Sequence, residues 1–353
     1  MTPLHVDSKG QPTSMVTFAT PTGTNNIGIL GIGAYRPQRL VANDEICANL
    51  DVDSEWIYTR TGIKSRRFCG RDESITTMSV EAGRAALANS GLTGADIDAL
   101  LLATSTHGRC IPSAAPPVAT AVGANGVPAM DVSVGCAGFG YAMSLAQDMI
   151  RSGSATRVLV IGAEEISMSL DMTDPGVSFI FGDGAGAVVV GPTPTRQVGP
   201  VVWGSEGSQS ELIHQSMDWK DYLLGASHTD RPYMRMNGTA VFRWAAFEMS
   251  KVAKRTLELT GITADDLDVF VPHQANARIN ELLAKNLKMR DGVPVADNIE
   301  YTGNTAAASI PLAMYDLLKS GRAKPGDTAL LLGYGAGLSY SGQVVAMPPA
   351  PTV

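Results

Sequence analysis

The sequence contains two copies of one segment, and this internal repeat constrains the fold more than any other feature. Ser90-Gly-Leu-Thr-Gly-Ala-Asp-Ile-Asp98 leads into the apolar run 99–103, and Thr260-Gly-Ile-Thr-Ala-Asp-Asp-Leu-Asp268 leads into the apolar run 269–272. The two passages match in kind almost residue by residue. A short aliphatic run that follows a polar turn is typical of a buried strand. We therefore expect a duplicated fold.

A second pair of segments supports the duplication at nearly the same spacing. Asp98 and Asp268 are 170 positions apart, and Cys136 and Asn304 are 168 positions apart. Each of the latter two residues is followed, 16 and 17 positions later, by Ser-Gly. Both segments read as a strand, a turn of small residues and a helix. One copy thus presents a thiol at its turn, and the other presents an amide.

Aliphatic strands that alternate with helices indicate an α/β protein whose sheets are covered on both faces. A segment rich in Trp and Tyr lies between the two repeated parts and reads as a partly packed insert. The predicted division of the chain is a flexible tail at 1–25, a first half at 26–190, an insert or connection at 191–234, a second half at 235–347 and a tail at 348–353.

Composition excludes several classes of function. The 353 residues carry a formal net charge of −7, which argues against nucleic-acid binding because that function favours basic surfaces. The four cysteines fit no zinc spacing, so we expect no metal site. The sequence shows no export signal and no apolar stretch of the roughly 18 residues that a membrane span needs. We therefore expect a cytoplasmic protein with reduced cysteines.

Cys136 is a candidate nucleophile. It stands between a predicted strand and a helix from about residue 139 to 151, among the small residues Gly135, Ala137 and Gly138. The free N–H groups and the dipole at a helix N-terminus favour the thiolate, which is the nucleophilic form. The alternative is a buried structural cysteine, the commoner role for a lone thiol.

Two candidates lie in the second half. His273 directly follows the strand at 269–272, at the strand end where α/β proteins place their sites. Asn304 stands at the turn that matches Cys136, and the glycine-rich run 332–337 follows in the same half. Each also has an ordinary interpretation. His273 could be a histidine of the core, Asn304 could cap a helix, and the glycine-rich run could be a plain turn.

These residues and their flanks resemble the β-ketoacyl-acyl-carrier-protein synthase III family of the thiolase superfamily. Within that family, the sequence as a whole most resembles the actinobacterial branch. The resemblance covers about residues 26–347. It implies a homodimer with a five-layered α-β-α-β-α thiolase-like fold made of two pseudo-equivalent halves. The motifs that carry it are Glu55-Trp-Ile-Tyr-Thr-Arg-Thr-Gly-Ile63, Gly135-Cys-Ala-Gly-Phe139, Phe181-Gly-Asp-Gly-Ala-Gly186, Pro272-His-Gln-Ala-Asn276, Gly303-Asn-Thr305 and Gly333-Tyr-Gly-Ala-Gly337.

The same residues separate this family from its relatives. Thiolases would show a second catalytic cysteine near the C-terminus, but the last cysteine here is Cys136. Elongating synthases would have a second histidine where Asn304 stands. Chalcone-synthase-like enzymes share the Cys-His-Asn set and remain the nearest rival. A related polyketide or acyltransfer enzyme, and a non-catalytic acyl-CoA binder, also stay open.

The resemblance implies the initiating condensation of type II fatty-acid synthesis. The Cys136 thiolate takes the acyl group of an acyl-CoA, and malonyl-acyl-carrier protein then loses CO₂ and attacks the acyl-enzyme. His273, through its Nε–H, and the Asn304 amide would stabilise the enolate. Backbone N–H groups of Cys136 and Gly335 would form an oxyanion hole. No metal or redox cofactor is required.

Substrate contacts also follow from the resemblance. Trp56 and Arg60 would contact the adenine and phosphate end of CoA, Asn276 would line the pantetheine tunnel, and Arg278 would contact CoA or the carrier protein. Pro175 departs from the family, which usually has arginine there to clamp the adenine. We therefore expect weaker or differently posed CoA binding with the chemistry intact.

The acyl pocket and the carrier-protein surface complete the predictions. By the same resemblance, Ile111 occupies the position that shapes the far end of the acyl pocket across the dimer interface. A bulky aromatic residue there would restrict the starter acyl group to very short chains, but isoleucine is intermediate in size and does not decide the chain length. Basic side chains on two predicted helices would dock the acidic carrier protein, although solvated helix faces explain them equally well. These side chains are Arg243, Lys251, Lys254, Arg278 and Lys285.

Overall fold

The computed structural model describes residues 19, 21–225 and 231–351. Two sheets dominate these residues. The first has the strand order β1-β7-β6-β4-β5, and the second has the order β11-β12-β13-β8. The strands of the first sheet are β1 (Ile27–Tyr35), β7 (Gly184–Pro192), β6 (Val158–Glu164), β4 (Ala99–Ala103) and β5 (Ala129–Val132). Those of the second are β11 (Val269–Pro272), β12 (Thr328–Gly335), β13 (Ser339–Ala346) and β8 (Val198–Ser205).

The two sheets match strand for strand. In the first sheet β4 is parallel to β6, which is followed by antiparallel β7 and β1. In the second sheet β11 is parallel to β12, which is followed by antiparallel β13 and β8. A single parallel bridge between Phe270 and Val295 stands where β5 pairs with β4 in the first sheet. The predicted duplicated α/β fold is therefore confirmed.

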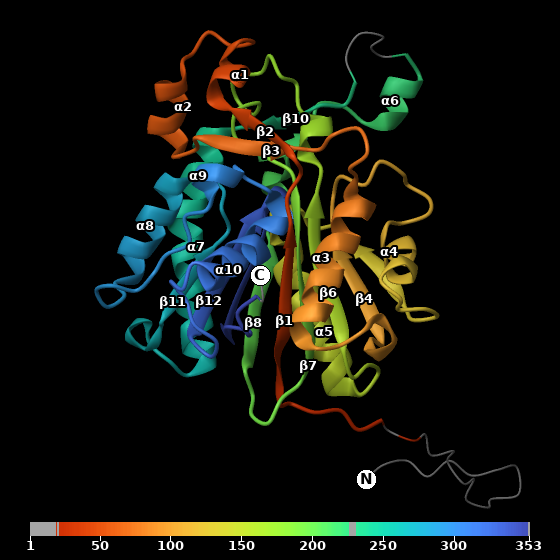
Figure 1. The fold of residues 1–353 in the computed structure, drawn as a ribbon. Helices are drawn as coiled ribbons and strands as arrows, with labels where there is room; N and C mark the ends of the chain where they lie inside the picture. The colour runs from red at the N-terminus through yellow and green to blue at the C-terminus, as the bar shows by residue number, and fades with distance from the viewer. Residues whose placement is uncertain (1–18, 20, 226–230, 352–353) are drawn as a thin grey trace, which may run out of the picture.

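Helices form the remaining layers (Figure 1). The helices α5 (Gly138–Ser152) and α10 (Ser309–Lys319) lie between the sheets and contact both of them. On the outside, α3 (Ile75–Ser90) and α4 (Ala115–Ala121) cover the first sheet, while α7 (Gly238–Thr260) and α8 (Ala277–Leu287) cover the second. The arrangement is the expected five-layered α-β-α-β-α fold.

The repeated polar segment has the same structural task in each half. It ends an outer helix at a glycine in the left-handed conformation, Gly91 with φ 69° and Gly261 with φ 80°. The Asp98 carboxylate then accepts the N–H group just before β6 at 2.9 Å, and the Asp268 carboxylate accepts the first N–H group of β12 at 3.0 Å. Each aspartate thereby fixes the pairing of the two parallel strands beside it.

Burial on both faces explains why the strands are continuously apolar. In β4, Ala99, Leu101 and Ala103 face the core around α5 and α10, whereas Leu100 and Leu102 face the core under α3. All five are fully buried. Because side chains of a strand alternate between its faces, a strand between two helix layers needs apolar residues at every position.

The remaining elements lie near one end of the two sheets. The pair β2 (Arg39–Ala42) and β3 (Ser65–Phe68) and the helices α1 (Asn43–Cys47), α2 (Ser54–Thr61) and α9 (Ile299–Thr302) are part of them. So are the pair β9 (Ile213–Gln215) and β10 (Met234–Met236) and the short helix α6 (Trp219–Leu223). In Figure 1 the labelled elements α1, α2, β2, β3, β10 and α6 lie above the two sheets.

The division of the chain into segments stays a prediction, with one change that we propose. Strand β8 falls inside the predicted insert 191–234, yet it forms the edge of the second sheet beside β13. We therefore begin the second half at β8. Most of the predicted N-terminal tail lies outside the described residues. No helix within residues 21–225 and 231–351 combines the length and apolar character needed to cross a membrane.

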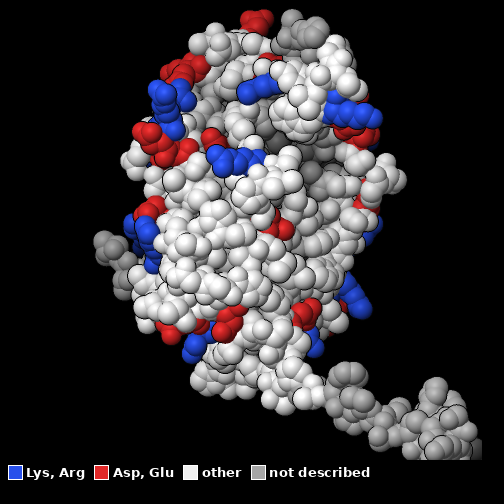
Figure 2. All heavy atoms as spheres, turned by 90° about the vertical axis from the view of Figure 1, so that its right-hand side faces the viewer, with Lys and Arg blue, Asp and Glu red and all other residues white. Residues whose placement is uncertain are grey.

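The face over α4 carries few charges. Figure 2 shows a broad expanse of uncharged side chains there, with acidic and basic residues mainly at its margin. Ile111, just before α4 in the chain, is 89% exposed, and Met130 is exposed on the edge strand β5. An open sheet edge beside an uncharged surface is a site at which another strand can add.

A substitution at Gly162 tests how closely β6 packs against the backbone just before α10. A Cβ atom at Gly162 in β6 would lie 2.2 Å from the carbonyl oxygen of Ala307, just before α10. We expect Gly162→Ala to lower the free energy of unfolding by about 1–3 kcal/mol, as overpacking does. Gly83→Ala in α3 is the matched control, since its Cβ would meet nothing closer than 3.4 Å. For Gly83→Ala, denaturant titration should show an unchanged free energy of unfolding or a rise of up to about 1 kcal/mol.

Candidate active site

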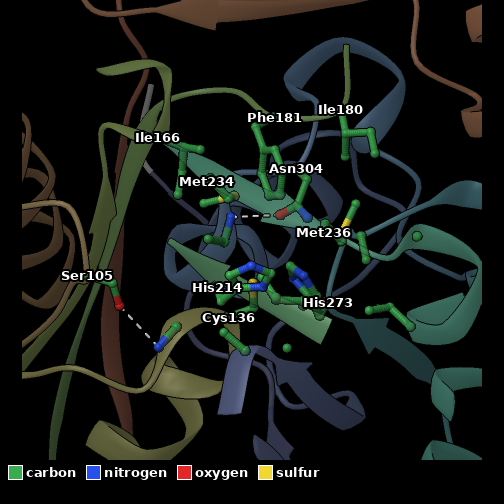
Figure 3. Close-up of a pocket in the computed structure, with 18 of the residues that line it drawn as sticks. Ser105, Cys136, Ile166, Ile180, Phe181, His214, Met234, Met236, His273 and Asn304 are labelled. Carbon is green, nitrogen blue, oxygen red and sulfur yellow. Dashed lines mark hydrogen bonds between the residues drawn. The ribbon is translucent and has the colours of Figure 1, made fainter. Parts of the chain in front are cut away.

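Cys136, His273 and Asn304 line one cavity of about 990 Å³ between the two halves. Figure 3 shows the three side chains turned toward this space. Cys136 comes from the turn before α5, His273 directly follows β11, and Asn304 lies between α9 and α10. The matched turns of the two copies thus meet, since the turn at 135–137 contacts the turn at 306–308 directly.

Burial controls the protonation state of the Cys136 thiol. The residue is 9% exposed and lies in the short turn Gly135–Ala137 that opens α5. Burial raises the pKa of the thiol to about 12, with a further rise from Glu164, while the N–H groups of Cys136 and Ala336 lower it. Burial therefore outweighs the helix N-terminus. The thiol keeps its proton at neutral pH and must lose it when it attacks.

The end of β12 passes directly over the cysteine. A Cβ atom at Gly335 would lie 2.8 Å from the Cys136 sulfur, so only glycine leaves space for the thiol at this position. The backbone N–H directed to the sulfur from this strand is that of Ala336, one residue beyond the predicted donor Gly335. The glycine-rich run thus gives the thiol both its space and a hydrogen-bond donor.

His273 is neutral and its orientation is fixed. It is 1% exposed, and burial lowers its pKa to about 3. Its Nδ1 lies 2.6 Å from the Ser309 hydroxyl, which also accepts the N–H of Gln274 at 3.3 Å. The hydroxyl proton is free to point to Nδ1, and when it does so the imidazole proton stands on Nε2. The ring packs edge-on against Tyr334, with 5.2 Å between centroids.

Asn304 is held by its backbone and by one side-chain atom. Its N–H donates to the carbonyl of Ile180 at 2.9 Å, and its own carbonyl accepts the N–H of Gly182 at 3.0 Å. The side-chain Oδ1 accepts the N–H of Ala306 at 2.8 Å, the upper dashed line in Figure 3. Since Oδ1 is engaged, the amide presents its Nδ2 donor to the cavity.

Glu164 is a buried cavity residue that the sequence analysis missed. Its carboxylate accepts hydrogen bonds from the Thr104 and Thr106 hydroxyls and from the Ser105 N–H. Burial raises its pKa to about 7. The Ser105 hydroxyl in turn accepts the N–H of Gly135 at 3.2 Å, so this cluster fixes the turn that carries the cysteine (Figure 3). The run Thr-Ser-Thr directly after β4 was the available signal.

Another part of the wall comes from the predicted insert and from β10. His214, Trp219, Met234 and Met236 all line the cavity. Within the described residues, Nδ1 of His214 is buried and has no hydrogen-bond partner. No periodic pattern marks these short elements in the sequence, because β9 and β10 have three residues each.

The predicted CoA contacts lie together, partly inside the cavity. Arg60 and Asn276 line it, and the Asn276 amide donates to the Arg60 carbonyl at 3.2 Å. Trp56 lies outside the lining, with its ring 4.1 Å from the Arg60 guanidinium carbon. Arg278 also lies outside, where it donates to the Thr59 carbonyl at 3.1 Å.

Two predicted specificity positions differ in their placement. Pro175 lines the cavity and offers no hydrogen-bond donor there. The neighbouring Arg235 forms ion pairs with Asp171 at 3.1 Å and Asp174 at 3.2 Å. Ile111 is outside the lining of this chain's cavity, on the exposed face over α4.

The predicted docking residues are placed around α7 and α8. A groove of about 450 Å³ between these helices is lined by Lys251, Lys254 and Lys285, together with Phe247, which is 68% exposed. Arg243 is exposed one turn or more before them on α7. Among the described residues, no three His, Cys, Asp or Glu side chains gather as a metal site would require.

Comparison with known sequences identifies the family. Residues 130–207 match the description 3-oxoacyl-acyl-carrier-protein synthase III, and residues 257–347 match its C-terminal part. The β-ketoacyl-acyl-carrier-protein synthase III of Mycobacteroides abscessus is 61% identical over 338 residues, which is 96% of this chain and 99% of the relative. The chain belongs to the β-ketoacyl-acyl-carrier-protein synthase III family. It is therefore an acyltransferase, the initiating condensing enzyme of fatty-acid synthesis.

Other synthases III agree in sequence and in fold. The mycobacterial enzyme of Mycolicibacterium paratuberculosis is 57% identical over 335 residues, 95% of this chain and 100% of the relative. The crystal structure of the Aquifex aeolicus synthase III has a TM-score of 0.83 at 37% identity, covering 91% of this chain and 99% of that chain. A priming β-ketosynthase from a polyketide pathway has a TM-score of 0.92 at 42% identity, covering 95% and 99%.

Ser309 gives a direct test of the His273 tautomer. We expect ¹⁵N NMR of labelled histidine to show neutral His273 with its proton on Nε2 from pH 8 down to about pH 5, because its pKa is about 3. Ser309→Ala removes the hydroxyl at Nδ1 and should leave a mixture of the two neutral tautomers. An imidazolium signal at pH 5, or an unchanged tautomer in Ser309→Ala, would contradict this assignment.

Proposed function

We propose that Cys136 takes its acyl group from an acyl-CoA and that malonyl-acyl-carrier protein is the extender. The single observation that carries this proposal is the meeting of Cys136, His273 and Asn304 in one cavity. The Cys136 sulfur attacks the thioester carbon and loses its proton, the bond from that carbon to the CoA sulfur breaks, and the CoA sulfur takes up the proton, so CoA departs as its free thiol. The acyl group is then held as a thioester on Cys136.

The second step needs donors, not a strong base. When the malonyl group loses CO₂, the electron pair of the broken bond forms an enolate whose oxygen carries the charge. Nε2–H of His273 and Nδ2–H of Asn304 are the two donors that the geometry offers to this oxygen. Each preorganised donor of this kind lowers a barrier by about 3–4 kcal/mol. The enolate carbon then attacks the acyl carbon of the acyl-enzyme, the carbon–sulfur bond breaks, and Cys136 leaves as a thiolate that takes up a proton from water.

Backbone groups around the sulfur would serve the acyl transfer steps. We keep the N–H groups of Cys136 and Gly335 as the proposed oxyanion hole for the tetrahedral intermediates. The N–H of Ala336, which already points to the sulfur, supports a donor role for the same turn. No step in this scheme uses a metal or a redox cofactor.

Arg60, Asn276, Trp56 and Arg278 would bind CoA at the cavity mouth. Their mutual contacts support a common role, since the Arg60 guanidinium stacks on the Trp56 ring. Pro175 cannot replace the arginine that family members use to clamp the adenine. Arg235 does not supply that charge freely, because two aspartates hold it. We therefore propose a differently posed adenine.

A second copy of this chain would cover the uncharged face over α4. The edge strand β5, the exposed Met130 and the scarcity of charges in Figure 2 support a homodimer built there. In such a dimer the exposed Ile111 would reach the acyl pocket of the partner. We also propose that the protein acts in the cytoplasm.

A second candidate is a priming role in polyketide synthesis. The observation that favours it is the TM-score of 0.92 to a priming β-ketosynthase of a polyketide pathway. The chemistry at Cys136 would be unchanged, and the carrier protein that delivers the malonyl group would differ. Assays with the two kinds of malonyl-carrier protein distinguish the candidates.

Mass spectrometry tests the proposed function most simply. After mixing with acyl-CoA, the protein should gain one acyl group, and Cys136→Ala should gain none. Addition of malonyl-acyl-carrier protein should remove the acyl group and give a 3-ketoacyl-carrier protein. An unmodified wild-type protein would indicate a binder, and an acyl group that malonyl-carrier protein leaves in place would indicate another acyltransferase.

Charge reversal tests the docking surface. Arg243→Glu with Lys254→Glu should raise KM for malonyl-acyl-carrier protein, because the carrier protein is acidic, and should leave Cys136 acylation by acyl-CoA unchanged. Arg84→Glu on α3 is the matched control, an exposed arginine remote from α7 and α8. An unchanged KM in the double variant, or an equal rise in the control, would rule out this surface.

A further inference from the structure

Among the described residues, Arg66 is the largest side chain that is fully buried. It lies on β3 with no exposed surface. Its Nη1 donates to Asn43 Oδ1 at 2.8 Å, its Nη2 donates to the Phe179 carbonyl at 2.5 Å, and its Nε has no partner. Within the described residues no carboxylate forms an ion pair with it. A buried charge with so little compensation is costly to fold and points to a task.

The side chain remains charged at neutral pH. Burial lowers the pKa of the guanidinium to about 10, which still leaves it protonated. In contrast, His273 is neutral, so the imidazole brings no positive charge to the cavity. The hydrogen bonds from Arg66 are therefore charge-assisted, and such bonds are stronger than neutral ones.

The contacts of Arg66 lead to Asn304. The Phe179 carbonyl that it binds belongs to the segment 179–182, whose members Phe179, Ile180 and Phe181 line the cavity. This segment holds Asn304 on both sides, since Ile180 accepts its N–H and the N–H of residue 182 donates to its carbonyl.

The stem of Arg66 makes a second connection. Glycines stand opposite its Cβ atom, and a Cβ atom at Gly182 would lie 3.0 Å from it and one at Gly303 would lie 3.2 Å from it. Gly303 also has φ 61°, a conformation that side chains rarely adopt. Gly303, which precedes Asn304, and Gly182, whose N–H donates to the Asn304 carbonyl, are thus both packed directly against Arg66.

From this geometry we infer that Arg66 is a positioning residue for the decarboxylation step, acting through segment 179–182 on the Asn304 amide. The inference rests on the proposed function, in which Asn304 Nδ2 donates to the enolate oxygen. Cys136 lies on the other copy of the repeat, where the Gly135 N–H in its turn donates to the Ser105 hydroxyl. Cys136 shares an apolar cluster with Phe179 and Phe181, but within the described residues no hydrogen bond joins its turn to this segment. Arg66 should therefore affect decarboxylation and spare acylation.

The test measures the two half-reactions separately. Acylation is followed by the mass of the protein after mixing with acyl-CoA, and decarboxylation by CO₂ release from malonyl-carrier protein with the pre-acylated enzyme. Arg66→Met should slow decarboxylation on the order of 10- to 100-fold, as small misplacements of catalytic groups do. Acylation should stay near the wild-type rate. A parallel fall of both rates would show a merely structural role and would overturn the inference.

A double-mutant cycle asks whether Arg66 acts through Asn304. The combined Arg66→Met, Asn304→Ala variant should decarboxylate no more slowly than Asn304→Ala alone, because the amide that Arg66 positions is already absent. Multiplied effects would contradict the inference. If Asn304→Ala itself leaves decarboxylation intact, the proposed function fails. If only Arg66→Met leaves it intact, the present inference fails.

Two further variants guard against loss of folding. Asn43→Ala removes the other hydrogen-bond acceptor of the guanidinium, which leads to α1 and not to segment 179–182. It should lower the melting temperature and leave decarboxylation near the wild-type rate; an equal slowing would overturn the inference. Arg66→Lys keeps the positive charge and the aliphatic stem. It should also slow decarboxylation selectively, but by a smaller factor, so it provides the test if Arg66→Met does not fold.

Discussion

The active site depends on the contact between the two matched turns, which open the central helices α5 and α10. The turn before α5 carries the thiol of Cys136 and the turn before α10 carries the amide of Asn304, so their contact brings both groups to one cavity. The backbone of the second turn lies so close to β6 that the strand needs a glycine there. The repeated polar segments make this packing possible, since each aspartate fixes the strand pair on which a central helix rests.

Burial then sets the chemistry of each group. It keeps the Cys136 thiol protonated and the His273 imidazole neutral at neutral pH, and it raises the pKa of Glu164 to about 7, so neither Cys136 nor His273 brings a charge to the cavity. Neutral donors in such a site interact strongly with a charge that forms there, because water does not compete. This suits a reaction whose intermediate is an enolate. The duplicated fold thus places the nucleophile in one copy and the enolate donors in the other.

Much of this could be predicted from the sequence, because the responsible patterns are local. The repeat, the continuous aliphatic strands and the motifs around Cys136, His273 and Asn304 each lie within about ten consecutive residues, where periodicity and turn chemistry are informative. The five-layered architecture and the family followed from these motifs through resemblance.

The rest depends on contacts between distant segments. The sequence places β8 in the insert because its two glycines, its proline and its mostly half-buried residues give no strand signal until it pairs with β13. Glu164 looked like the end of a strand, and its role appears only when the loop after β4 surrounds it. The partners of Arg66 are equally remote, with Phe179 lying 113 positions away. Cavity walls from elements of three residues leave no periodic trace.

The central claim is that the two copies divide the reaction, and one measurement tests it most directly. The rates of Cys136 acylation and of malonyl decarboxylation should be compared in wild type and His273→Ala. The account predicts that decarboxylation falls on the order of 10²- to 10³-fold, as for other lost oxyanion donors, while acylation continues near its normal rate. Equal loss of both rates, or decarboxylation that survives without the imidazole, would contradict it.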